Sequence, residues 1–554
     1  MRVLVLVLLL IVFPFLTNAK GDLPFLTKNN STNPEHTLLW VPQSPADTIP
    51  NHLEIKQDIG YRQKPSSAVG SSLGSVEADD FNPGLISDPL LLIRGQLAGL
   101  QYNRTGGDPN RSSVLRVRGT SLSANPDPLI VIDGIIGADL QQVDPNDIAE
   151  ITLLRDASAT TIYGMRAASG ALLIRTKNAD TQQPGWHLNY HGQTAVSELA
   201  GEVPIMDAEL FVNSGGTNLG AMTNWSDEIT RTAWSQAHGL AVSYNKAKTQ
   251  LRFSNNYRQV DGIQLNSGFR QWNSRLKVQT DAGLERLQIN LDGAFNFRTV
   301  DYGFPEAFYY ATSYNPTAPV RATAPATLDP DQLGGYFERL GLFDFFNPRS
   351  ILDQNLHKSR SNGYNLGIKA DYEIIPSLKI TARFARQAAT QRERAYYPTT
   401  SLFRGNAVSP TNKGRADYLD FNSSFNLLET YASLHEQNDR RTIDLLFGYS
   451  YQLTLGDGEE QSLGDLTDVD YDFRDALDPP TPTVAPLFQL SRSVLPEDKI
   501  SALFARLAID WSSGVFAQAS LRGERYNRFG TQNPLFWLPA LNLGIDLNKR
   551  QKQT

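Results

Sequence analysis

Hydrophobic and polar residues alternate with a period of two along several stretches beyond residue 179. In residues 285–299 one parity carries Leu287, Ile289, Leu291, Phe295 and Phe297, and the other carries Gln288, Asn290, Asp292, Asn296 and Arg298. The same alternation recurs in residues 365–374, 378–384, 443–453 and 503–511. Because residues of one parity share a face of a β-strand, these segments predict amphipathic strands with one apolar and one polar face.

Such strands occur both in soluble β-sandwiches and in transmembrane β-barrels, but three features favour a barrel. The strands have about 9 to 13 residues, which is enough to cross a membrane. Aromatic residues suited to a membrane interface lie near strand ends, at Trp186, Tyr257, Tyr372, Tyr449 and Trp511. Short turns, at residues 375–377 and 512–514, alternate with long loops, at residues 301–361, 390–420 and 456–499. Short turns of outer-membrane barrels face the periplasm and long loops face outside, so loop length predicts the orientation.

Residues 114–177 have a different pattern, in which Gly, Pro, Asp and Ser separate short apolar runs. The runs are Val114 to Val117, Leu129 to Ile132, Ile151 to Leu154 and Leu172 to Ile174. Runs bounded by such turn residues predict short strands. Asp156 can cap a short helix that Gly164 can end in a left-handed conformation, and residues 90–97 predict another short helix. This stretch therefore predicts a small mixed α/β unit.

Several motifs of this unit follow the order found in one known family. They are R-V-R-G-T-S-L, P-L-I-V-I-D-G, D-P-N-D-I-A-E-I-T-L-L-R-D-A-S-A-T-T-I-Y-G and A-A-S-G-A-L-L-I-R-T-K. In these motifs the chain resembles the plug domain of SusC/RagA-like TonB-dependent outer-membrane receptors. The resemblance implies a soluble plug that fills a β-barrel from the periplasmic side and is displaced or remodelled to admit substrate. It implies no catalytic role for the motif residues, which are Arg116, Arg118, Gly119, Asp133, Gly134, Asp156, Tyr163, Gly164 and Gly170.

The resemblance extends, with variable strength, from about Tyr61 to the end of the chain. Residues 224–262 and 522–547 resemble barrel strands of the same family. Residues 61–180 are then the plug, and residues 186–554 are a partial transmembrane barrel. The expected fold class is mainly β, an antiparallel transmembrane β-barrel with a small N-terminal α/β plug domain.

The N-terminus carries the signals of export. Residues 1–19 combine an early Arg2, an apolar core and the small residues Thr17, Asn18 and Ala19, which predicts a cleaved signal peptide. An uncleaved anchor is the alternative, although an apolar core of about 14 residues is short for one. Residues 20–50 are rich in Asn, Thr, Pro and Ser, and residues 20–60 predict a periplasmic N-terminal segment. The resemblance places the mature protein in the outer membrane of a Gram-negative bacterium.

Residues 53–58 stand where the resembling family carries its TonB-interacting segment, and we name them the coupling segment. They are Leu53, Glu54, Ile55, Lys56, Gln57 and Asp58. An extended segment of alternating character can add as a strand to the edge of a partner's sheet, which is how TonB would make contact. Lys56, Gln57 and Asp58 interrupt what is usually a valine-rich run, so a plain linker is the alternative.

Composition excludes several other functions. The formal net charge is −7 without long basic runs, which gives no indication of a nucleic-acid partner. The chain has no cysteine, so disulfides, thiolate metal sites and cysteine nucleophiles are excluded. The seven histidines are scattered, and no catalytic motif of a hydrolase occurs, so we expect no enzyme activity, cofactor or metal. The mean hydropathy of −0.33 argues against a bundle of membrane helices.

Two loop features leave alternatives open. The acidic stretch 456–478 could bind calcium, but Phe473 and Pro479 stand where an EF-hand loop needs glycine and glutamate, so a solvated outer loop is the alternative. Aromatic residues crowd two other stretches and could bind a ligand or a lid protein, or could pack the loops. They are Tyr302, Phe304, Phe308, Tyr309 and Tyr310, then Tyr336, Phe337, Phe343, Phe345 and Phe346.

The resemblance implies a receptor that takes up a nutrient oligomer, either an oligosaccharide or a peptide. Its expected partners are TonB with the inner-membrane energising complex, a SusD-like substrate-binding lipoprotein and outer-membrane lipid. A passive porin or an adhesin is the other reading, but neither would have a reason to carry a plug.

The number of predicted strands differs from that of the resembling family. We count about 12 strands, whereas the family closes its barrel with about 22, and a ring of 12 would leave little room for the plug. The chain also ends in the polar residues 548–554 without the terminal aromatic that such barrels usually carry. We therefore expect a truncated or frame-shifted receptor that does not insert and transport alone.

Overall fold

The computed structural model describes residues 56–58, 61, 63–65, 72–104, 108–111, 113–119, 127–179, 184–281, 285–322, 333–338, 345–406, 414–464, 490–529 and 534–546. All of them belong to one compact unit, Glu54–Thr554. The predicted signal peptide and the first three residues of the coupling segment lie outside the described residues. Six of the seven aspartates in the acidic stretch 456–478, all except Asp457, lie outside them too.

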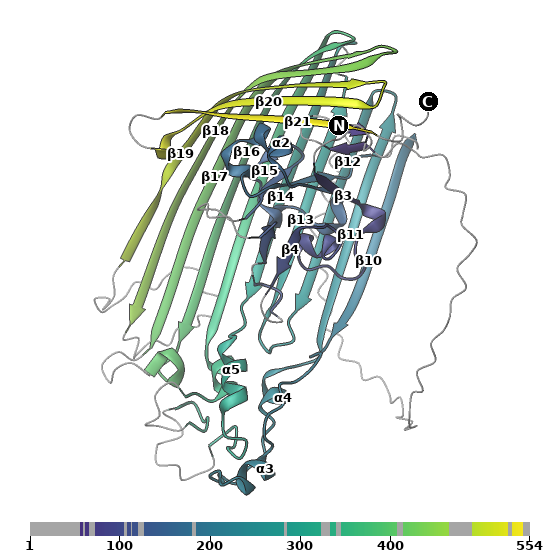
Figure 1. Ribbon diagram of the computed structural model, residues 1–554. Helices are drawn as coiled ribbons and strands as arrows, with labels where there is room; N and C mark the ends of the chain where they lie inside the picture. The colour runs from purple at the N-terminus through teal and green to yellow at the C-terminus, as the bar shows by residue number, and fades with distance from the viewer. Residues whose placement is uncertain are drawn as a thin grey trace, which may run out of the picture. The chain divides into compact units, whose positions relative to one another are not determined.

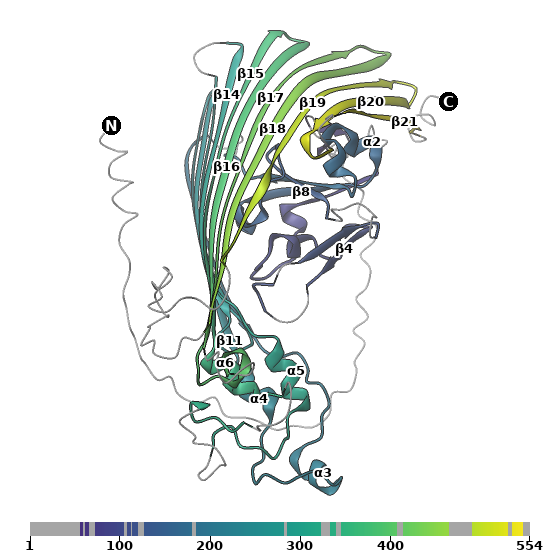
Figure 2. The same ribbon diagram turned by 90° about the vertical axis from the view of Figure 1, so that its left-hand side faces the viewer.

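Twelve strands of the described residues form one antiparallel sheet in which each strand pairs with the next along the chain. The strands are β10 (Gly185–Ser197), β11 (Ala233–Lys246), β12 (Thr249–Asp261), β13 (Gly268–Thr280), β14 (Leu287–Asp301), β15 (Leu356–Ile375), β16 (Leu378–Tyr397), β17 (Arg415–Gln437), β18 (Arg441–Gly464), β19 (Leu490–Trp511), β20 (Val515–Tyr526) and β21 (Leu535–Ile545). The sheet is strongly curved, and the N-terminal α/β region lies on its concave side (Figures 1 and 2). The mainly β fold and the expected strand number are confirmed for the described residues.

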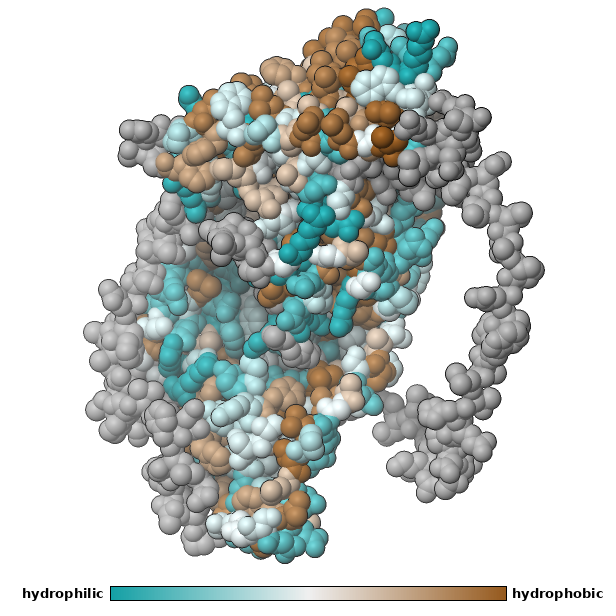
Figure 3. Space-filling view, viewed as in Figure 1, coloured by the Kyte–Doolittle hydropathy of each residue, from teal (hydrophilic) through white to brown (hydrophobic). Residues whose placement is uncertain are grey.

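The two faces of the sheet differ as the alternation predicts. Apolar side chains such as Phe295, Ile368 and Phe384 are exposed on the convex face. Polar side chains of the opposite parity, such as Asn296 and Thr381, are buried against the N-terminal region. In Figure 3 hydrophilic residues gather in the middle of the face that carries this region, and hydrophobic residues gather near the top, around β20 and β21. The polar faces of the strands therefore point inward, as predicted.

Strand length departs from the prediction. Strands β10 to β14 have 13 to 15 residues, but β15 to β19 have 20 to 24. A membrane-spanning strand needs only about 9 to 11 residues, so β15 to β19 are longer than a membrane crossing requires. Parts of the expected loops 390–420 and 456–499 are strand, whereas the described part of the loop 301–361 is strand only at 301 and 356–361. The short turns at 376–377 and 512–514 lie where predicted.

The N-terminal region contains a five-stranded sheet in the order β3, β8, β9, β6, β7. These strands are β3 (Leu73–Glu77), β8 (Ile148–Leu154), β9 (Ala171–Thr176), β6 (Leu129–Ile132) and β7 (Ile135–Ile136), and a hairpin of β4 (Leu100–Asn103) and β5 (Val114–Val117) stands beside them. The helix α2 (Ala157–Thr160) begins at Asp156, whose carboxylate accepts a hydrogen bond from the Ala159 amide at 2.9 Å. The chain leaves this turn at Gly164, where φ is 84°. The four predicted strands and the capped helix are confirmed, while the helix expected over 90–97 is a shorter 3₁₀ turn, Pro89–Ile93.

Two hydrophobic clusters join this region to the large sheet. The first adds Ala385, Phe425 and Leu427 of β16 and β17 to the core of the small sheet. The second packs Tyr163 with Tyr431, Leu446 and Phe504. The region therefore rests on β16 to β19. We call the twelve-stranded sheet the wall, and the described residues between 61 and 179 the plug.

Short helices lie at the end of the large sheet opposite the short turns (Figures 1 and 2). They are α3 (Ala208–Asn213), α4 (Trp225–Ile229), α5 (Glu306–Ser313) and α6 (Pro348–Gln354). No helix of the described residues is long and apolar enough to cross a membrane. The predicted orientation makes this end the outer one, and we call it the outer cap.

Candidate functional site

Many buried polar and charged groups of the described residues lie at the interface between the plug and the concave face of the sheet. The first contact joins a turn of the plug to β12. Asp147 accepts hydrogen bonds from Arg252 at 2.9 Å, from Ser254 at 2.8 Å and from Asn256 at 2.8 Å, and Asp144 pairs with Arg258 at 3.1 Å. The four partners occupy alternate positions of one strand, so the inward face of β12 forms a row of donors for two plug carboxylates. Burial raises the pKa of Asp144 although Arg258 opposes the shift.

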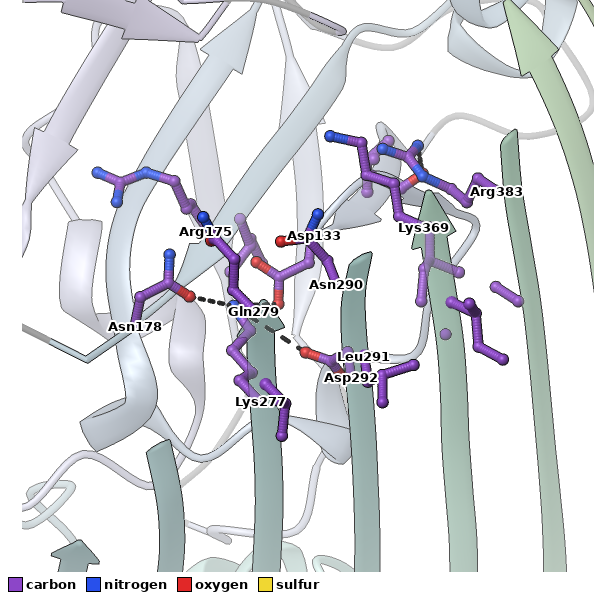
Figure 4. A pocket seen from close by; sticks show the side chains of 18 of the residues that line it. Asp133, Arg175, Asn178, Lys277, Gln279, Asn290, Leu291, Asp292, Lys369 and Arg383 are labelled. Atoms are coloured by element: carbon purple, nitrogen blue, oxygen red, sulfur yellow. Dashed lines mark hydrogen bonds and ion pairs between the residues drawn. The ribbon is translucent and has the colours of Figure 1, made fainter. Parts of the chain in front are cut away.

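The second contact is centred on Asp133, in the tight turn between β6 and β7. Its carboxylate accepts hydrogen bonds from the amide and the hydroxyl of Thr176, and it pairs with Arg275 at 3.1 Å and Lys277 at 3.2 Å. Asp292 of β14 pairs with the same arginine at 2.8 Å. Burial alone would raise the pKa of Asp133, but Lys277, Arg275 and the Thr176 bonds outweigh it and lower the pKa to about 2. Figure 4 shows Asp133, Lys277 and Asp292 directed toward one another.

The third contact needs a glycine at position 134. The carbonyl of Gly134 accepts a hydrogen bond from Arg383 at 2.8 Å, and a β-carbon there would lie 2.5 Å from the guanidinium. Arg383 also pairs with the fully buried Glu429 at 3.2 Å. Glu429 in turn accepts a hydrogen bond from the hydroxyl of Tyr61 at 2.8 Å. A single carboxylate of β17 therefore connects the plug turn with the first residue of the plug.

Tyr61 itself is held in an aromatic site. Its ring stacks on Tyr163 with centroids 5.9 Å apart and lies 5.2 Å from Tyr431 and 5.3 Å from Phe504. The backbone of Tyr61 has φ of 61°, a conformation that costs a bulky residue about 1 to 3 kcal/mol. The ring contacts and the hydroxyl bond offset that cost, so Tyr61 is fixed by tertiary contacts rather than by its local sequence.

The fourth contact lies at Gly164. Arg522 and Glu524 of β20 form an ion pair at 2.8 Å with both side chains almost fully buried, and Arg522 donates to the carbonyl of Ile162 at 2.9 Å. A β-carbon on Gly164 would lie 2.0 Å from the Glu524 carboxylate. Beside this contact Arg166 bonds Gln452 of β18. This glycine is thus required by both its backbone conformation and the close approach of the wall.

The remaining motif residues act inside the plug. Arg116 pairs with Asp127, and Arg118 donates its amide to the Gly99 carbonyl at 2.8 Å. Gly119 and Gly170 adopt φ of 94° and 97°, and the latter approaches the backbone of Leu154 closely. Of the predicted site residues, Asp133, Gly134, Tyr163 and Gly164 therefore meet the wall, whereas Arg116, Arg118, Gly119, Asp156 and Gly170 shape the plug.

The sequence interpretation did not single out Asp144, Asp147 or the arginines of the wall. The sequence did contain one indication of this contact. Residues 252–258 carry four polar residues of one parity, a pattern that predicts a polar, inward face of a strand. Nothing in the sequence shows which plug residue meets that face.

Two cavities lie between the plug and the wall. The first has a volume of about 330 Å³ and is lined from the plug by Asp133, Gly134, Tyr163, Arg175 and Asn178, and from the wall by β12 to β17 (Figure 4). The second, of about 360 Å³, lies among β15 to β19 and reaches the turn at Pro376 and Ser377. In the part of the chain that the structure describes, no cluster of three or more His, Asp or Glu side chains could hold a metal ion.

The coupling segment is described only for Lys56–Asp58, which forms strand β1. This strand pairs antiparallel with β2 (Gln63–Pro65), so Lys56 lies opposite Pro65 and Asp58 opposite Gln63. One edge of β1 is therefore already occupied within the chain. Contact of residues 53–58 with TonB stays a prediction.

Most of the outer aromatic residues pack against one another. Phe304, Tyr310 and Tyr336 are buried, and Tyr302, Phe308, Phe337, Phe345 and Phe346 are half-buried, whereas Tyr309 is 66% exposed. Most of them join a cluster with Trp225 of α4 and Phe403, and Phe343 lies outside the described residues. For these residues the packing alternative is the better supported one.

Comparisons with known proteins match this arrangement. The model of the TonB-dependent Receptor Plug Domain matches residues 66–171. The chain is 26% identical over 508 residues to TonB-dependent receptor P3 of Formosa agariphila, covering 88% of this chain and 48% of that protein. It is 27% identical over 446 residues to TonB-dependent receptor SusC of Bacteroides thetaiotaomicron, covering 73% of this chain and 43% of that protein. The chain thus spans about half the length of the curated relatives it matches, and the expected truncation stays a prediction.

Solved structures share the fold. The RagAB peptide importer in its open-open state superposes with a TM-score of 0.72 at 18% identity, over 88% of this chain and 58% of that chain. The ferric citrate transporter FecA in the unliganded form gives a TM-score of 0.51 at 10% identity, over 86% of this chain and 60% of that chain. At these identities the likeness concerns the fold of a plugged β-sheet wall.

Proposed function

The chain is a SusC/RagA-like TonB-dependent receptor, and from that premise we propose that it forms the plug and a large part of the wall of an importer for oligomeric nutrients. The relatives are named as receptors, which supports transport rather than catalysis. The proposed location is the outer membrane of a Gram-negative bacterium, where the apolar convex face would contact lipid.

One observation carries this proposal: the plug is bound to the wall at separate polar contacts on β12, β13, β16 and β20. Each contact consists of buried ion pairs and hydrogen bonds, which are costly to break singly. A passive channel would have no use for such a closure. An importer that is opened by an external energy source needs a plug that stays shut until force is applied, and we propose that TonB supplies that force through residues 53–58.

The cargo we propose is a nutrient oligomer, and both an oligosaccharide and a peptide remain candidates. The similar RagAB structure is titled a peptide importer, and at 18% identity it indicates fold rather than cargo. We also propose a SusD-like substrate-binding lipoprotein as partner at the outer cap, in line with the SusC likeness. Neighbouring genes would decide the cargo, because glycoside hydrolases beside the locus favour a glycan and peptidases favour a peptide.

Deleting the coupling segment tests the proposal. Cells that carry the receptor at its own locus would be offered fluorescent oligosaccharide and tryptic peptide mixtures, and uptake into energised cells would be measured. Deletion of residues 53–58 should abolish uptake of the imported mixture without lowering the amount of receptor in the outer membrane. Deletion of the six residues 40–45 of the same N-terminal segment is the matched control and should leave uptake intact. Full uptake after the first deletion would place the coupling segment elsewhere.

A further inference from the structure

Tyr61 lies at the boundary between the two cavities. Three residues line both of them, namely Tyr61, Lys369 and Tyr431. Lys369 and Tyr431 belong to β15 and β17, where each is fixed in a paired strand. Among these shared lining residues, Tyr61 alone comes from the start of the plug and not from a strand of the wall, so it can move without unfolding the wall.

The contacts of Tyr61 close the boundary. Its ring fills the space between Tyr163 of the plug and Tyr431 and Phe504 of the wall. Its hydroxyl is bonded to Glu429, which also holds Arg383 against the plug turn. Removing the side chain of Tyr61 would therefore open the aromatic site. It would also remove a hydrogen bond from Glu429, which holds Arg383 against the plug turn.

The position of Tyr61 in the chain connects this boundary with the coupling segment. Strand β1 ends at Asp58, three residues before Tyr61. An extended chain spans at most about 3.3 to 3.6 Å per residue, so a pull that moves β1 by about one nanometre must move Tyr61 as well. Among the described contacts between plug and wall, the ring of Tyr61 is thus the first that a pull on β1 reaches.

We infer that Tyr61 is the gate of a passage between plug and wall, which opens when β1 is pulled and joins the two cavities toward the periplasmic turns. This inference rests on the proposed function. The opened passage would run from Asp133 along β15 to β17 to the turn at Pro376. The plug need not leave the wall as a whole, because Asp144 and Arg258, which pair at 3.1 Å, line neither cavity.

The lining indicates what the passage would admit. Its charged side chains are paired, as in Lys277 with Asp133, Lys369 with Asp371 and Arg383 with Glu429. Amides of Asn178, Gln279 and Asn290 line the first cavity between these pairs. Paired charges and amides offer hydrogen bonds without trapping an ion, which suits a hydrated, uncharged oligomer that passes in an extended form. Each cavity has a volume at the lower end of the range of ligand pockets, about 300 to 1,000 Å³.

A leak assay in de-energised cells tests the gate. Cells that express the receptor from its own locus would be treated with a protonophore, and the entry of radiolabelled stachyose, a neutral tetrasaccharide, into the periplasm would be measured. Tyr61→Ala should raise the entry rate several-fold, whereas Tyr61→Phe, which keeps the ring, should stay near the wild-type rate. Tyr102→Ala is the matched control, because Tyr102 is a half-buried plug tyrosine that lines neither cavity.

A second variant covers the case in which Tyr61→Ala does not reach the outer membrane. The chain has no cysteine, so Tyr61→Cys provides a single thiol. The cysteine variant should leak, and reaction with benzyl methanethiosulfonate, which restores a ring, should close it again. The inference would be overturned if Tyr61→Ala and Tyr61→Cys both kept the wild-type rate of stachyose entry, or if Tyr102→Ala leaked as fast as they do. Since the assay needs neither TonB nor the natural cargo, its outcome is separate from the uptake test of the proposed function.

Discussion

Removing the Asp147 carboxylate should loosen the plug strongly. In the structure Asp147 is 4% exposed and Arg252 is 12% exposed, and the carboxylate also serves Ser254 and Asn256. Loss of one partner of a buried ion pair costs about 3 to 5 kcal/mol. Arg252 lines the first cavity, where water can reach it, so we expect Asp147→Ala to cost about 3 kcal/mol, near the lower limit of that range.

The assay uses the absence of native cysteine. Ala171 of β9 is fully buried in the plug, and Ala171→Cys would introduce one small thiol that reacts only when the plug opens. At 1.4 kcal/mol for each factor of ten, Asp147→Ala should raise the labelling rate of this thiol about a hundredfold.

Asp127→Ala is the control for this measurement. Asp127 is a plug carboxylate that pairs with Arg116 but is 57% exposed, and exposed pairs contribute at most about 1 kcal/mol. Equal labelling rates in Asp147→Ala and Asp127→Ala would refute the claim that buried polar contacts hold the plug to the wall.

Three further predictions follow from other contacts. Gly164→Ala should weaken the plug by about 3 kcal/mol or more in the same labelling assay, because the new β-carbon meets Glu524 and the alanine must adopt a positive φ. The control is Gly84→Ala, at a positive φ in open space, which should cost only about 1 to 2 kcal/mol. Burial raises the pKa of Glu338 in the outer cap from 4.5 to about 7. Between these pH values the folded cap binds more protons than the unfolded chain, so the stability of the cap should fall as the pH rises. Hydrogen exchange of α6 at pH 5 and pH 8 should show this loss, of roughly 3 kcal/mol at most, and Glu338→Gln should remove it. Phe384→Arg on the convex face should cost about 2 to 4 kcal/mol and lower the amount of folded receptor in membranes, while Tyr309→Arg in the outer cap should leave it unchanged.

The local sequence pattern was sufficient to predict strands that have an apolar environment on one face and a polar environment on the other. Residues 378–384 expose apolar side chains on one face and turn polar side chains inward on the other, so their strand and its inward face follow from parity. The cap at Asp156 and the turn at Gly164 follow from residue types alone. The length of β18 could not be predicted, because residues 456–464 do not keep the alternation of apolar and polar positions.

The contacts between the plug and the wall, by contrast, could not be predicted from the sequence. Parity shows that Arg275 points inward, but not that Asp133, more than a hundred positions earlier, lies beside it. The depth at which the plug sits is fixed by the packing of two curved surfaces. For the same reason the sequence gave no indication that the ring of Tyr61 enters an aromatic site of the wall.

Thiol accessibility in intact cells tests the central claim, a plug held inside a membrane-embedded wall, most directly. Three single-cysteine variants would be compared: Glu77→Cys in the plug, Tyr309→Cys in the outer cap and Phe384→Cys on the convex face. A membrane-impermeant maleimide added from outside should label only Tyr309→Cys, a lipid-soluble maleimide should label Phe384→Cys, and Glu77→Cys should react with the impermeant reagent after the outer membrane is permeabilised. Labelling of Glu77→Cys from outside as fast as Tyr309→Cys would contradict the account.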